Sequence, residues 1–335
     1  MQKLVKAISR GKKHVPFFVL CVLLLAALVI SALTTTKQIG VNAVPSISYE
    51  QSVPSTGSRI FNGNGIALDS NDNMFVINRS NPTDIKKINA TGDLVTQWGS
   101  YGSGNGQFSL PHIVAVDNSD NVYVTDENFY VQKFDNNGNF VYKIGGYGTG
   151  DGQFSSLIYL AFDSSNNMYA TGSNGTIQKF DISGNFVSRI GSAGTGDGQF
   201  NSSGPYGVAI DSNDNIFAVD SSRIQKFDSS GTFVTKWGSS GCCGSGFFSS
   251  PRYIAIDSSD NVYVGQISGQ YMVQKFDNDG VYISEVGEPT IFGIGGMAFD
   301  SSDRLNLITE PTSGTSYAQD IIQLDTSLAT VGRIA

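Results

Sequence analysis

The sequence predicts an all-β fold in which six similar four-stranded units pack around one axis, and three observations lead to it. A run of apolar residues that ends in Asp recurs six times, at intervals of 48, 46, 48, 46 and 43 residues. A second pattern, usually Gln-Lys-Phe-Asp, recurs six times in phase with the first. The residue two positions before the first Asp is alanine in all six copies. Repetition at a fixed period is typical of repeat architectures.

Four strands, a to d, are predicted in each copy. In the second copy they are Ile113–Val116, Val122–Thr125, Tyr130–Phe134 and Phe140–Ile144. The a–b and c–d turns consist of Asp, Asn, Ser and Gly, which adopt turn dihedrals and cap their own backbone. The apolar runs are too short for helices. Strand a ends at Asp69, Asp117, Asp163, Asp211, Asp257 and Asp300, and strand c ends at Asn89, Asp135, Asp181, Asp228, Asp277 and Asp325.

Each unit has apolar side chains on both faces, so it cannot bury itself alone. The strand-c residues Phe134, Phe180, Phe227 and Phe276 each need a neighbouring unit to cover them. Radial packing supplies that cover and leaves only short edges. The recurring alanine fits this arrangement, because six converging inner strands leave little room near the axis. The sequence therefore predicts a six-bladed β-propeller of four-stranded antiparallel blades.

Two segments also carry a family resemblance. GQFSLPHIVAVDNSDNVYVTD, followed by Gln-Lys-Phe-Asp, and GPYGVAIDSNDNIFAVDSSRIQKFD resemble NHL repeats, a family of six-bladed β-propellers. The similarity covers residues 57–335, and the first and sixth copies are degenerate, as terminal repeats often are. The family includes ligand-binding modules, RNA-binding modules and related lyases and hydrolases. The resemblance therefore implies the fold and leaves the function to be argued from the site.

The chain is expected to close its ring in phase. The sixth copy carries its own outer strand, Ala329–Ile334, so residues 57–335 supply all six blades. Residues 34–56 then serve as a tether. Within that tether Ser46–Glu50 could alternatively pair as an extra edge strand.

The N-terminal segment predicts a membrane connection. Residues 1–14 are basic, and residues 15–33 form an uncharged run that would span about 28 Å as a helix, close to the thickness of a bilayer core. The basic cluster predicts a cytoplasmic N-terminus and an exported propeller. The run exceeds the usual length of a signal-peptide core, which favours a single-pass anchor, whereas Val41-Asn42-Ala43 offers a cleavage pattern for a secreted product.

Composition excludes several functions. Residues 38–335 contain 15 Lys+Arg and 29 Asp+Glu, a formal charge of −14 that would repel a phosphate backbone, so no nucleic-acid partner is expected. The chain has only two histidines, His14 and His112, too few for a multi-histidine metal site. We predict no cofactor and no metal.

The mouth of the central channel is the predicted ligand site. The residue five before each strand-a Asp, together with the b–c connections, should lie on this face. The candidates are Asn64, His112, Tyr206, Arg252, Asp126, Asp220 and Glu310. Ring, guanidinium and carboxylate groups in one place can orient an anionic or aromatic ligand. Alternatively, these residues are solvated or hydrogen-bond to neighbouring blades.

His112 is the sharpest candidate for a general base or a metal ligand. Arginine or tyrosine occupies its position in other copies, which favours a structural or surface role. The related amidating and streptogramin-type lyases depend on more than one channel histidine or on a bound metal. We therefore predict no catalytic residue.

Other motifs have simpler explanations. The glycine-rich stretches GSGNGQF, GTGDGQF and GCCGSGFF precede strands rather than helices, so they predict flexible crossings between blades, anchored by Phe108, Phe154, Phe200 and Phe248. The a–b turns hold oxygens that could bind calcium, but Asx-turn capping explains them better. Adjacent Cys242 and Cys243 could form a disulfide, pair between chains or stay reduced. Asn78, Asn89, Asn174 and Asn201 begin glycosylation sequons.

These observations favour a non-catalytic binding or scaffold module for a protein, peptide or glycan, held outside the membrane. The alternative is a propeller hydrolase or lyase with a metal in the channel, which would require Asn64, Asp126, Asp220 and Glu310 to converge on one cation. A purely structural adhesin is a third hypothesis.

Overall fold

The structure, a computed structural model, describes residues 65–334 except 80–82, 157, 174, 202–203, 242–243, 268–270, 288–291 and 311–319. The predicted N-terminal segments (1–14, 15–33 and 34–56, with the pairing of Ser46–Glu50) lie outside the described residues. Among the residues that are described, none forms a helix with the length and hydropathy that a membrane crossing needs.

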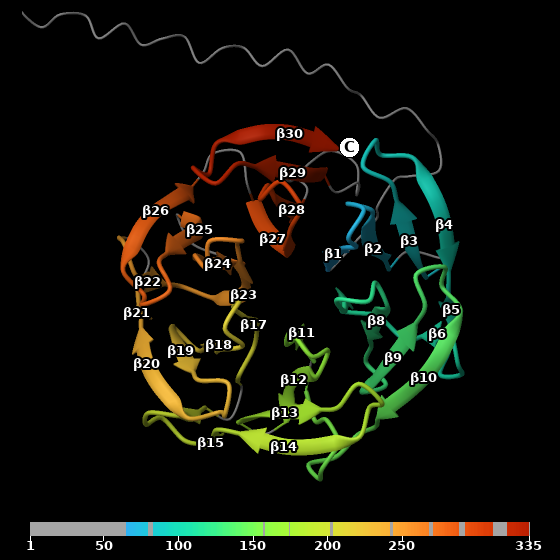
Figure 1. Ribbon diagram of the computed structural model, residues 1–335, viewed down its shortest axis with the longest axis horizontal. Coiled ribbons are helices and arrows are strands. Elements are labelled where there is room, and N and C mark those ends of the chain that lie inside the picture. Colours follow the sequence, from blue (N-terminus) through green and yellow to red (C-terminus); the bar gives the residue numbers. More distant parts are fainter. Residues whose placement is uncertain are drawn as a thin grey trace, which may run out of the picture. The chain divides into compact units, whose positions relative to one another are not determined.

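The described strands form six four-stranded antiparallel sheets, the blades, each ordered as in the sequence (Figure 1). Blade 1 contains β1 (Ile66–Leu68), β2 (Met74–Asn78), β3 (Asp84–Ile88) and β4 (Leu94–Trp98). Blade 2 contains β7 (Ile113–Val116), β8 (Val122–Thr125), β9 (Tyr130–Phe134) and β10 (Phe140–Gly145). Blade 3 contains β11 (Leu160–Phe162), β12 (Met168–Ser173), β13 (Thr176–Phe180) and β14 (Phe186–Ile190).

The second half of the ring repeats this plan. Blade 4 contains β17 (Val208–Ile210), β18 (Ile216–Asp220), β19 (Arg223–Phe227) and β20 (Phe233–Trp237). Blade 5 contains β23 (Pro251–Ile256), β24 (Val262–Gln266), β25 (Tyr271–Phe276) and β26 (Tyr282–Gly287). Blade 6 contains β27 (Phe292–Phe299), β28 (Leu305–Glu310), β29 (Asp320–Leu324) and β30 (Thr330–Ile334). The strands predicted for the second copy and the outer strand of the sixth are confirmed to within one residue.

The ring closes between blades 6 and 1. Each inner strand contacts the inner strand of the next blade, and β27 of the last blade contacts β1 of the first. The Gly65 N–H donates to the Gly295 carbonyl at 2.8 Å across this junction. A similar bond joins Gly207 N–H to the Arg252 carbonyl between blades 4 and 5, where a Cβ on Gly207 would lie 2.5 Å from that oxygen. Glycine at these positions lets adjacent inner strands approach closely.

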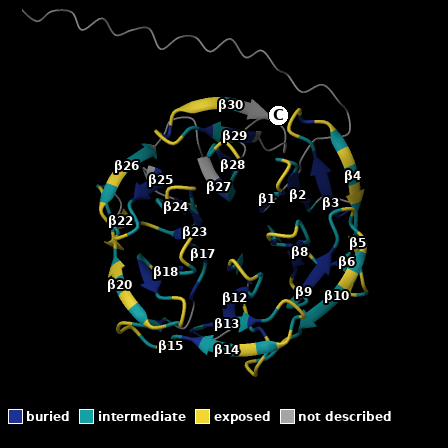
Figure 2. Cartoon of the chain, in the orientation of Figure 1, coloured by how far each residue is buried: buried dark blue, intermediate teal, exposed yellow. Residues whose placement is uncertain are grey.

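The core is divided into six apolar clusters, one between each pair of adjacent blades. Figure 2 shows the burial concentrated in the inner and middle strands, whereas the outer strands alternate between exposed and half-buried residues. The recurring alanine belongs to these interfaces: Ala209 packs against Val262 and Val264 of the next blade. The predicted radial packing is therefore confirmed, and the alanine is small because the next blade lies against it.

The a–b turns form a second closed ring. In each turn the third residue after the strand-a Asp has a φ between 58° and 62°: Asp72, Asp120, Asn166, Asp214, Asp260 and Asp303. Its side chain accepts a backbone N–H of the preceding blade's turn, as from Ser70 to Asp120 at 2.8 Å. The same bond from Ser301 to Asp72, at 2.7 Å, links blade 6 to blade 1. The predicted Asx capping is confirmed, because Asp69 accepts the N–H groups of Asn71 and Asn73 at 3.0 and 2.9 Å.

The glycine-rich crossings are held in place by hydrogen bonds. Short parallel pairs join β5 (Ser100–Tyr101) to β6 (Gln107–Phe108), β15 (Ser192–Ala193) to β16 (Gln199–Phe200), and β21 (Ser239–Ser240) to β22 (Phe247–Phe248). The buried Gln132 of strand c accepts from Gly106 N–H and donates to the Gln107 carbonyl. Gln178, Gln225 and Gln274 repeat both bonds in later blades. The predicted Phe anchors are fully buried, and the sequence interpretation missed the glutamine contacts.

Candidate functional site

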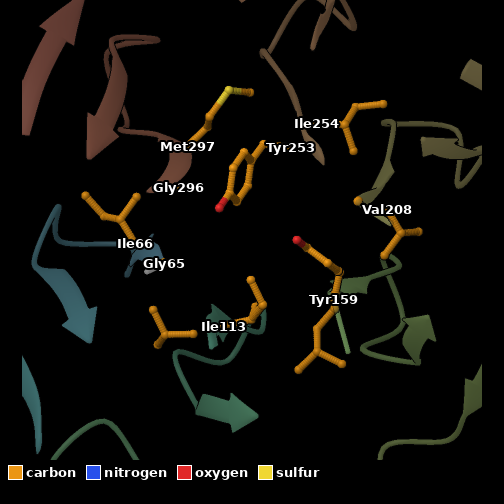
Figure 3. Close-up of a pocket in the computed structure, with 12 residues that line it drawn as sticks. Gly65, Ile66, Ile113, Tyr159, Val208, Tyr253, Ile254, Gly296 and Met297 are labelled. Carbon is orange, nitrogen blue, oxygen red and sulfur yellow. The ribbon is translucent and has the colours of Figure 1, made fainter. Parts of the chain in front are cut away.

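Two consecutive residues from each blade line the central channel (Figure 3). They stand four and three positions before the strand-a Asp: Gly65 and Ile66, Ile113 and Val114, Tyr159 and Leu160, Gly207 and Val208, Tyr253 and Ile254, and Gly296 and Met297. The cavity volume is about 80 Å³. Pockets for drug-sized ligands measure about 300–1,000 Å³. The channel can therefore accept a small group but not a whole ligand.

One side of the channel mouth is built from three tyrosines and an arginine. The hydroxyls of Tyr159 and Tyr253 point into the channel, and the two rings meet edge to face with centroids 6.1 Å apart (Figure 3). Arg252 lies over the Tyr206 ring, 4.8 Å from its centroid, and its charge acts on the Tyr159 hydroxyl. Burial raises the pKa of Tyr159, and the charge of Arg252 only partly opposes this. Tyr159 is therefore a neutral phenol at physiological pH.

A second group at the mouth consists of His112, Glu127 and Arg79. The His112 Nε2 lies 3.5 Å from the Glu127 Oε1. Arg79 follows β2 and interacts through its charge with His112, Glu127 and Tyr253. Burial, assisted by the charge of Arg79, lowers the pKa of His112 despite the opposing charge of Glu127. His112 is consequently neutral at pH 7.

We call these seven residues the mouth cluster: Arg79, His112, Glu127, Tyr159, Tyr206, Arg252 and Tyr253. Blades 1 to 5 all contribute to it. Of the predicted site residues, the structure brings His112, Tyr206 and Arg252 together here. The sequence interpretation missed Arg79, Tyr159 and Tyr253. The two tyrosines could have been found, because each is a large side chain four positions before the strand-a Asp.

Asp126 and Asp220 form the hydrogen bonds that were predicted from the sequence as the alternative to ligand binding. Asp126 accepts the N–H of Ser109 at 2.9 Å and two bonds from Asn128 at 3.1 and 2.9 Å. Asp220 accepts the N–H of Asn201 at 3.2 Å and pairs with Arg223 at 2.9 Å. Both carboxylates are buried. They hold the glycine-rich crossing that enters their blade against the end of strand b. The backbone N–H groups of that crossing have no acceptor in the sheet, and these carboxylates accept their hydrogen bonds.

The remaining predicted positions are placed as follows. Asn64, Asn174, Cys242 and Cys243 lie outside the described residues, and Glu310 ends β28. Asn78 is buried and donates to the Asp84 carboxylate at 2.7 Å. Asn89 accepts the N–H of Thr91 at 3.0 Å. Asn201 bonds to the Ser221 hydroxyl.

The lowered pKa of His112 predicts a pH-dependent stability. In the unfolded chain this histidine is protonated below about pH 6.5, whereas the fold disfavours its protonation. Neutral His112 therefore contributes to the free energy of unfolding above that pH, and this contribution is lost as the pH falls through the pKa of the folded state. Between about pH 7 and pH 5 the wild type should lose more unfolding free energy than His112→Gln. Urea denaturation at each pH measures this, and parallel losses in both proteins would contradict it.

Comparisons with known proteins support the fold. No family model matches the chain, and no curated protein matches it either. Among solved structures, virginiamycin B lyase from Staphylococcus aureus is similar with a TM-score of 0.57 and 14% identity, over 80% of this chain and 83% of that one. A streptogramin B lyase has a TM-score of 0.58 and 12% identity, over 85% and 84%. A gluconolactonase from Xanthomonas campestris has a TM-score of 0.54 and 12% identity, over 78% and 85%.

These likenesses establish the architecture. The chain is a six-bladed β-propeller. At 12–14% identity, the activities of the similar proteins do not transfer with the fold.

Proposed function

We propose that this propeller is a non-catalytic binding or scaffold module of the NHL type, which holds a protein, peptide or glycan at the channel mouth. The observation that supports the proposal is the mouth cluster, in which five blades place aromatic, guanidinium and carboxylate groups around one opening. Polar and aromatic side chains of these types, converging on one opening, are typical of ligand sites.

The proposed location is outside the membrane. Residues 15–33 anchor the chain, or are cleaved to release it, and residues 34–56 act as the tether.

Array binding tests this function. Purified full-length protein is applied to peptide and glycan arrays, beside the variant Tyr206→Ala with Arg252→Ala and the control Val234→Ala. Val234 lies on the outer strand and is 51% exposed. Specific binding that the mouth variant loses and the control keeps is the expected result. Binding that survives the mouth changes would place the ligand elsewhere and refute the proposal.

An enzymatic function is the second candidate, favoured by the close His112–Glu127 pair and by the lyase and lactonase activities of the similar structures. The metal-dependent form fits poorly, because the oxygens of Asp126 and Asp220 are engaged with the crossings. Among the described residues, no three metal-ligating side chains gather at one point. Turnover of lactone or cyclic-ester substrates that His112→Gln abolishes would favour this candidate.

A further inference from the structure

The mouth cluster differs in charge from the rest of the propeller. Residues 38–335 carry a formal charge of −14, whereas the mouth cluster holds two arginines, one glutamate and a neutral histidine. A cationic mouth on an acidic body attracts an anionic group to this point and leaves the remaining surface repulsive to it.

Arg252 has the geometry to bind a carboxylate. The central carbon of its guanidinium lies over the Tyr206 ring, 4.8 Å from the ring centroid, and its charge acts on the Tyr159 hydroxyl. A guanidinium carries five N–H donors in one plane, so stacking on a ring face leaves donors at its edge. Such an edge matches the two oxygens of a carboxylate.

Below the mouth cluster the cavity lining is mixed, with apolar side chains beside tyrosine hydroxyls and backbone groups. Ile66, Ile113, Val208, Ile254 and Met297 line it, and the Tyr159 and Tyr253 hydroxyls reach into it (Figure 3). A volume of about 80 Å³ suits a group of a few heavy atoms. The Tyr159 hydroxyl, a neutral phenol, can donate a hydrogen bond to an anion at the top of the channel.

We infer that the channel mouth binds a carboxylate that carries a small apolar group, with the carboxylate on Arg252 and the apolar group in the channel. The inference rests on the proposed binding function of this face. The same chemistry is found in the C-terminal residue of a peptide and in a free small acid.

Calorimetric titration of the full-length protein tests this with three probes: N-acetyl-L-alanine, its amide and propionate. The acids are expected to bind saturably and the amide at least about tenfold more weakly, since a charged hydrogen bond is lost. N-acetyl-L-alanine binding more tightly than propionate would identify a peptide end, and the reverse order a free acid.

Two variants test whether Arg252 is the residue that binds the carboxylate. Arg252→Gln should weaken both acids at least about tenfold and leave the amide unchanged, whereas Arg189→Gln, which removes the same charge from the outer strand, should leave all three unchanged. Thermal unfolding of each variant confirms that it is folded.

Equal binding of acid and amide, no binding of the acids at millimolar concentration, or an Arg252→Gln variant with unaltered acid affinity would each overturn the inference. If array ligands still depend on the mouth in that case, only the carboxylate assignment fails. If they do not, the proposed function fails as well.

Discussion

Replacing Phe227 with alanine should lower the free energy of unfolding by about 3–5 kcal/mol, because the ring is buried between two blades and its loss leaves a cavity. Phe227 is 1% exposed and belongs to the cluster between blades 3 and 4. Its ring lies 5.6 Å from Phe200, the anchor of the incoming crossing, and 6.1 Å from Phe233 on the outer strand. One substitution therefore weakens the blade, its neighbour and the crossing that joins them.

Urea denaturation followed by tryptophan fluorescence measures this effect. Phe247→Ala is the matched control, since Phe247 is 43% exposed and its truncation should cost much less. Equal losses for the two variants would argue that the interface between blades 3 and 4 does not pack as described.

Asp257→Ala should be comparably destabilising, at about 3–5 kcal/mol, because it leaves a buried lysine without its counter-charge. The Asp257 Oδ2 lies 3.4 Å from the Lys275 Nζ, and their side chains are 2% and 8% exposed. Asp257 also accepts the Asn261 N–H at 2.8 Å and the Tyr263 hydroxyl at 3.0 Å. Removal of the carboxylate therefore leaves several buried donors unsatisfied.

The pH dependence of this loss has a definite sign. Burial raises the pKa of Asp257, but hydrogen bonds from Asn261 and Tyr263 and the charge of Lys275 outweigh it, so the pKa is lowered. The carboxylate then stabilises the fold above its ordinary pKa of about 3.9 and ceases to do so as the pH falls through the folded value. The difference in unfolding free energy between wild type and Asp257→Ala should therefore become smaller in that acidic range.

Asp277→Ala is the control for this prediction. Asp277 caps a c–d turn, accepting the N–H groups of Asp279 and Val281 at 3.0 and 2.8 Å. Its loss should cost about 1 kcal/mol, the usual value of a capping side chain. A similar cost for Asp257→Ala, measured by urea denaturation at neutral pH, would show that the buried pair does not contribute as argued.

The same pair recurs around the ring, although the sequence interpretation did not identify it. Lys87, Lys133 and Lys179 lie 3.2, 3.3 and 3.2 Å from the strand-a Asp of their own blades. Two blades differ. In blade 4 Lys226 lies 3.9 Å from Asp279 of the next blade instead. In blade 6 strand c has Gln323 at this position, and Asp300 pairs with Arg304 of its own a–b turn at 2.7 Å. The spacing of Asp and Lys along the chain does not reveal the contact, since strand b separates the two strands in the sheet.

The sequence by itself determined the number of blades, the order of strands and the turn chemistry, because these depend on local propensity and on a period that repeats along the chain. Only the tertiary structure decided which polar residues meet. Asp126 and Asp220 were site candidates in the sequence, but their carboxylates hydrogen-bond to the backbone of the crossings. Arg79, Tyr159 and Arg252 come from three different blades and meet at the channel mouth. Such a meeting depends on the rotation of one sheet against the next, and no interval along the chain encodes that rotation directly.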